Sequence, residues 1–95
     1  MEDLQVILIQ NFMARLQKFP QITSPFMMMG EKMLFKIRDK KGNINVYYVI
    51  ENKNKYELFK PESGADINDL TKYKSQGVYN SKKLVKKLEE EIEKK

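Results

Sequence analysis

The sequence predicts an α+β fold: an N-terminal amphipathic helix, a three- to four-stranded antiparallel meander, a short helix and a charged C-terminal helix. Three observations predict it. Apolar residues recur at helical spacing near the N-terminus, alternate at strand spacing through the middle, and form a narrow helical stripe within the lysine- and glutamate-rich end. A chain of 95 residues has room for one core, so residues 1–95 are expected to form a single small domain.

The first helix is expected over residues 3–19. Asp3 is a suitable N-cap, and Pro20 ends the helix because the residue before proline avoids helical angles. The apolar stripe is unusually wide: it comprises Leu4, Leu8, Phe12 and Phe19, flanked by Val6, Ile7, Ile9, Met13 and Leu16. This helix is therefore expected either to be buried on two sides or to meet another chain.

Strands are expected over residues 31–39, 44–52 and 55–59, with a turn at Gly42 and another around residues 52–55. Residues 26–29 fit either a fourth short strand or a packed loop, and their methionines are expected to fill the core. One sheet face is expected to be fully apolar. The other is expected to be mixed, with Leu34, Lys36, Arg38, Tyr47, Val49 and Phe59 side by side on adjacent strands.

The last third of the chain is expected to begin as a loop and then to form two helices. Asp66 can cap a short helix in which Ile67, Leu70 and Tyr73 point inward, and Gly77 is a natural stop. A terminal helix, capped by Asn80 or Ser81, follows. Its narrow stripe consists of Leu84, Val85, Leu88 and Ile92.

The composition excludes several functional classes. The chain has neither cysteine nor histidine, so disulfides, thiolate nucleophiles and cysteine–histidine zinc sites are excluded. The start Met-Glu-Asp does not resemble a secretory signal, and the longest apolar run, residues 46–50, is far shorter than the roughly 20 residues that cross a bilayer. We expect a cytoplasmic protein with no membrane partner and no cofactor, and a non-enzymatic role is favoured.

The basic charge favours a polyanion as partner. The net charge is +5, and sixteen of the eighteen basic residues are lysine. Lysine supplies a point charge, whereas the planar fork of arginine reads bases and clamps phosphates. DNA or RNA would therefore be bound through phosphates, without strong sequence preference. A genome rich in A and T would also produce this composition, because lysine, asparagine, isoleucine and tyrosine have AT-rich codons.

Two groups of residues are candidates for nucleic-acid binding. On the mixed sheet face, the aromatic rings could stack on bases while the neighbouring cations contact the phosphates. The alternative is that a helix buries this face. In the terminal helix, a lysine cluster precedes a glutamate cluster, which is the reverse of the order that the helix dipole favours. This costly order suggests that the lysines bind phosphates. The alternative is that the charged residues form a solvated helix face with its own ion pairs. The candidate residues are Lys36, Arg38, Tyr47 and Phe59 on the sheet, and Lys82, Lys83, Lys86 and Lys87 on the helix.

Two other readings stay open. The wide first helix favours a protein-interaction module, or a homodimer joined through that helix. In addition, the segment from Arg38 to Lys53 resembles the hairpin of the PD-(D/E)xK nuclease family, with Glu51-Asn52-Lys53 as the acid-x-lysine motif. This resemblance implies Mg²⁺-dependent cleavage and a further acid near Glu51, for which Asp39 and Glu31 are the candidates.

Overall fold

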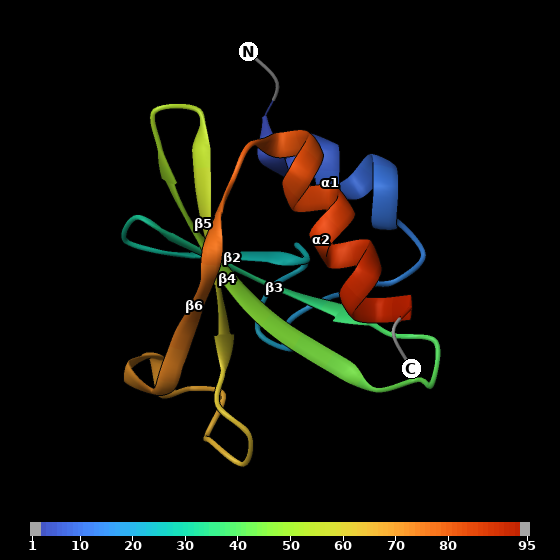
Figure 1. The fold of residues 1–95 in the computed structure, drawn as a ribbon. Helices are drawn as coiled ribbons and strands as arrows, with labels where there is room; N and C mark the ends of the chain where they lie inside the picture. Colours follow the sequence, from blue (N-terminus) through green and yellow to red (C-terminus); the bar gives the residue numbers. More distant parts are fainter. Residues whose placement is uncertain (1–2, 94–95) are drawn as a thin grey trace.

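The computed structural model describes residues 3–93 and confirms the predicted α+β class (Figure 1). It contains two α-helices and a six-stranded antiparallel sheet. The elements are α1 (Leu4–Phe12), β1 (Leu16–Gln17), β2 (Phe26–Met29), β3 (Lys32–Arg38), β4 (Ile44–Asn52), β5 (Lys55–Pro61), the 3₁₀ turn η1 (Leu70–Lys72), β6 (Tyr73–Tyr79) and α2 (Ser81–Glu93). The strand order is β1-β3-β4-β5-β6. β2 also pairs with β3: β1 pairs with residues 36–37 of that strand and β2 with residues 32–35.

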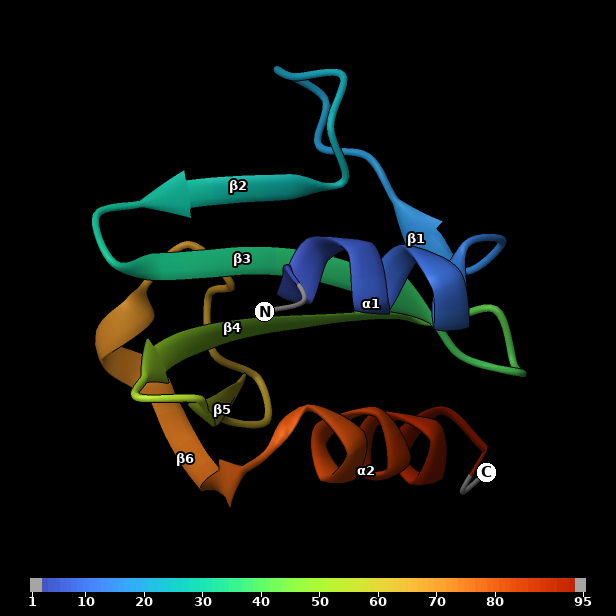
Figure 2. The same cartoon turned by 90° about the horizontal axis from the view of Figure 1, so that it is seen from above.

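Both helices lie on the same face of the sheet, side by side (Figures 1 and 2). The main core lies between the sheet and these helices and includes Leu8 and Phe12 of α1, Phe35 and Tyr47 of the sheet, and Leu88 of α2. We call this the helix-covered face. The opposite, loop-covered face holds a second, smaller core, which includes Phe19 from the segment before β2 and Leu70 of η1. Within residues 3–93 no helix is long and apolar enough to cross a membrane.

The strand register contradicts the predicted mixed face. In β3 and β4, Phe35 pairs with Tyr47 and Leu34 with Tyr48; across the next hairpin, Tyr48 pairs with Phe59. Directly paired residues project to the same face, so Tyr47 lies on the helix-covered face while Leu34 and Phe59 lie on the loop-covered face. The prediction placed β4 one residue out of register, and such a shift moves every side chain of a strand to the other face.

Two turns fix this register. The β4–β5 turn has two residues, Lys53 and Asn54, with φ of 50° and 67°, as a type I′ turn requires. The longer β3–β4 turn is closed by Asp39, whose Oδ1 accepts the backbone N–H groups of Lys41 and Asn43, both at 2.9 Å. Gly42 in this turn has φ of 87°, as expected for a glycine placed at a turn.

The first helix is shorter than predicted. Asp3 caps it as expected, its side chain accepting the N–H of Gln5, but α1 ends at Phe12 rather than Phe19. Leu16 and Gln17 instead pair with β3, and the N–H of Arg38 donates to the carbonyl of Arg15 at 2.8 Å. Tertiary strand pairing here overrides the helical propensity of the segment.

Three further predictions need correction. Residues 26–29 do form a strand, but Met28 and Met29 are exposed at 57% and 47%, so they do not fill the core. The predicted short helix is a single 3₁₀ turn, and Tyr73 begins the edge strand β6 rather than pointing from that helix. Gly77 does not end a helix: it lies within β6 with φ of 113°, beside an irregularity in the pairing with β5.

The terminal helix follows its prediction. The Oδ1 of Asn80 accepts the N–H of Lys83 at 2.9 Å, which makes Asn80 the cap. Leu84, Leu88 and Ile92 are buried, and Val85 packs at the margin of the core. Most charged residues of α2 therefore lie on its outer side, whereas Glu91 is half-buried and paired with Lys60 of β5.

Candidate nucleic-acid interface

Three of the four candidate lysines of α2 meet at one groove. Lys83, Lys86 and Lys87 line a shallow groove of about 430 Å³, together with Glu90 and with Tyr79 at the end of β6. Lysines at these positions share one side of a helix because residues three and four apart are neighbours on its surface. The structure thus assembles a lysine cluster beside an aromatic ring.

These lysines have no ion-pair partner within residues 3–93. No carboxylate oxygen in that range lies within 4.0 Å of the ammonium groups of Lys82, Lys83, Lys86 or Lys87. Lys87 and Glu91 are four residues apart, a spacing that allows an ion pair on a helix, but Glu91 accepts instead from Lys60 of β5, with Nζ and Oε1 3.1 Å apart. The positive charge of the cluster is therefore available to a ligand.

The Tyr79 ring is held beside the cluster by its own strand. Its hydroxyl donates to the carbonyl of Gln76. A Cβ on residue 77 would lie 3.0 Å from this hydroxyl, so Gly77 gives the ring the space to fold back. Tyr79 was not among the predicted binding residues. Its position four residues before Lys83, next to the helix cap, is the feature of the sequence that could have indicated it.

Lys82 points to a different groove. It lies with Gln10 and Asn11 of α1 and with Val85, between the two helices. The four lysines thus lie within six consecutive residues, 82–87, but are divided between two sides of α2.

The candidate residues of the sheet do not join this interface. Tyr47 is fully buried on the helix-covered face, where its ring packs against Phe35 with centroids 5.6 Å apart. Burial raises the pKa of the Tyr47 phenol, helped by the charges of Glu91 and Asp39. Because this side chain is part of the core, it cannot stack on a base, and the expectation that it shares a surface with Phe59 is wrong.

The remaining three lie on the loop-covered face or at its edge. Phe59 is half-buried and stacks on Tyr48, with ring centroids 4.4 Å apart and planes at 12°. Lys36 is half-buried, its Nζ 4.5 Å from the centroid of the Phe19 ring. Arg38 is exposed and donates to Gln17 Oε1 at 3.0 Å. This face lies across the sheet from α2, so the eight predicted residues form no single surface.

The acids that matter for the nuclease resemblance are spread along β4. Glu51 and Glu31 line one groove with Asp3, whereas Asp39 lies beyond the opposite end of the strand. In the part of the chain that the structure describes, no three acidic side chains are grouped closely enough to hold a metal ion. Comparisons with family models, curated proteins and solved structures find no match to this chain.

Proposed function

We propose that this protein is a nucleic-acid-binding module that contacts phosphates through α2, without strong sequence preference. The observation that supports it is the groove that Lys83, Lys86 and Lys87 line together with Glu90. In residues 3–93 no carboxylate oxygen, including those of Glu90, lies within 4.0 Å of the three ammonium groups. Lysines neutralise phosphates as point charges, so they bind any sequence alike.

The sheet aromatics are not part of this proposal. Tyr47 is in the core, and Phe59 already stacks on Tyr48. Tyr79 is the ring that borders the lysine groove, where it is half-buried. Phosphate contact therefore carries the binding, and a base stacked on Tyr79 would add to it.

A pair of triple variants tests the location of the interface. Changing Lys83, Lys86 and Lys87 to Gln removes three charges from the groove, while changing Lys40, Lys41 and Lys53 to Gln removes three charges from exposed turns. In fluorescence anisotropy with labelled oligonucleotides, the first variant should bind at least about tenfold more weakly than the second at the same salt concentration. If both variants weakened binding equally, the oligonucleotide would be attracted by the overall positive charge of the protein and not by an interface on α2.

A homodimer joined through α1 is the second candidate function. Val6, Ile9 and Met13 are exposed at 46%, 37% and 71%, and their spacing places them on one stripe of the helix, away from the core. Exposed apolar stripes of this kind often mark interfaces.

The dimer predicts a mass near twice 11.3 kDa by light scattering. Changing Val6 and Met13 to Glu should return the protein to the monomer mass without unfolding it, because both side chains are exposed. A wild-type protein that stays monomeric at high concentration would rule this candidate out.

A further inference from the structure

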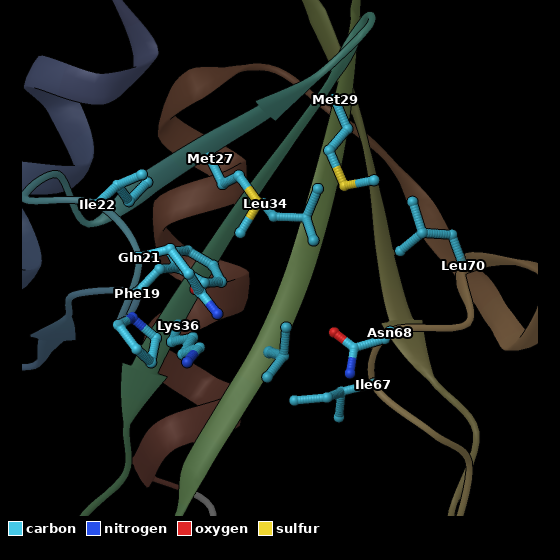
Figure 3. Close-up of a pocket in the computed structure, with 12 residues that line it drawn as sticks. Phe19, Gln21, Ile22, Met27, Met29, Leu34, Lys36, Ile67, Asn68 and Leu70 are labelled. Carbon is cyan, nitrogen blue, oxygen red and sulfur yellow. The ribbon is translucent and has the colours of Figure 1, made fainter.

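A second groove lies on the loop-covered face, across the sheet from α2 (Figure 3). It has a volume of about 520 Å³, within the usual range for small-molecule sites. Phe19 and Ile22 lie on one side and Ile67 and Leu70 on the other, with Leu34 of β3 between them. Lys36, also of β3, lies beside Phe19. Met27 and Met29 also line it, and their flexible side chains can adapt to an apolar ligand.

The lining is apolar except for two amides and one cation. Among the residues that the structure describes, Lys36 is the only charged side chain that lines the groove. No carboxylate of residues 3–93 lies within 4.0 Å of its Nζ, which rests over the Phe19 ring. The nearby acids of the flanking loop are engaged locally: Asp66 accepts the N–H of Asn68, and Asp69 accepts that of Thr71.

We propose that this groove binds an amphiphilic carboxylate, such as a medium-chain fatty acid, with its chain along the apolar floor and its carboxylate on Lys36. Charge complementarity favours an anionic ligand. The half-buried ammonium group of Lys36 has no anionic partner in residues 3–93, and a carboxylate would form a charge-assisted hydrogen bond with it. Gln21 and Asn68 can donate further hydrogen bonds from the two sides of the groove. This inference is independent of the proposed nucleic-acid interface, which lies on the other side of the sheet.

The test is titration calorimetry of the full chain with decanoate below its micelle concentration. Changing Lys36 to Gln should weaken decanoate binding by about tenfold, the loss typical of one charge-assisted hydrogen bond. The matched control is Lys32→Gln: Lys32 is on the same strand and face, with its Nζ 5.5 Å from the Tyr48 ring, but it does not line the groove. This control should bind decanoate like the wild type.

A rim variant keeps the test independent of any effect of Lys36 on folding. Ile67 is exposed at 43%, so Ile67→Glu should leave the fold intact and repel the carboxylate, whereas Ile67→Gln should weaken binding less. Decanol should bind more weakly than decanoate to the wild type. Absence of decanoate binding, or equal affinity for decanol that Lys36→Gln leaves unchanged, would overturn the proposal.

Discussion

At the scale of single residues, the Tyr47 hydroxyl is buried without a hydrogen-bond partner in the described structure. Such a group loses its hydration and gains nothing in return. Changing Tyr47 to Phe should therefore raise the free energy of unfolding by about 1 kcal/mol, whereas Tyr47→Ala should lower it by about 3–5 kcal/mol through the cavity that it leaves. Urea denaturation measures both.

Tyr73 provides the control for that pair. Its hydroxyl donates to the carbonyl of Ile67 at 2.7 Å, so Tyr73→Phe should lower the free energy of unfolding by about 1 kcal/mol. If Tyr47→Phe destabilised the protein as much as Tyr73→Phe, the Tyr47 hydroxyl would have a partner in solution.

Asp39 gives a prediction about pH. Burial would raise the pKa of its carboxyl, but hydrogen bonds from Asn43, Asn45 and Lys41 outweigh this and lower it below 3.8. The carboxylate therefore stabilises the fold above pH 3.8, and this contribution disappears as the pH falls through the folded-state pKa. The stability difference between the wild type and Asp39→Asn, from urea unfolding, should shrink in that range. A difference that is constant with pH would contradict this assignment.

At the scale of elements, the two-residue turn between β4 and β5 controls which face each strand presents. Asn54, at φ of 67°, tolerates this conformation better than most residues, and a β-branched side chain does not. Asn54→Val should lower the free energy of unfolding by about 1–2 kcal/mol, while Asn54→Gly should change it by less than about 0.5 kcal/mol. Equal effects of the two substitutions on urea unfolding would show that the turn conformation is not restrictive.

The elements themselves were largely predictable from periodicity, but their register was not. The stripe of α2 gave its buried residues, Leu84, Leu88 and Ile92. In β4, by contrast, Val46, Tyr47, Tyr48 and Val49 are all buried, so alternation did not show which face is which. The lengths of the turns before and after a strand set its register, and the register decides which side chains lie on each face. The local sequence of the strand indicates these turn lengths only weakly.

The edge strands β1 and β6 escaped prediction for a related reason. β1 has only two residues and β6 contains Gly77, so neither shows a clear alternating pattern. Both exist because a neighbouring strand offers hydrogen bonds: β3 for β1 and β5 for β6. Contacts between distant segments decide such strands, and these are not visible in a local window.

At the scale of the whole molecule, the sheet separates two chemically different surfaces. The lysine groove of α2 lies on the helix-covered side, and the apolar groove around Lys36 lies on the loop-covered side. The lysine cluster was visible in the sequence as a charge run. The contribution of Tyr79 and the division of the eight candidate residues between faces required the three-dimensional arrangement, because β6 and the strand register determine both.

The most direct test of the central claim is the salt dependence of oligonucleotide binding, measured by fluorescence anisotropy with single and double strands of several sequences. If Lys83, Lys86 and Lys87 each neutralise a phosphate, the logarithm of the binding constant should fall linearly with the logarithm of salt concentration, with a slope of about −3 on duplex DNA. The slope should be the same for every sequence, and it should approach zero when these lysines are changed to Gln. Binding that is insensitive to salt, or no binding at low salt, would contradict the claim that α2 is a phosphate-binding surface.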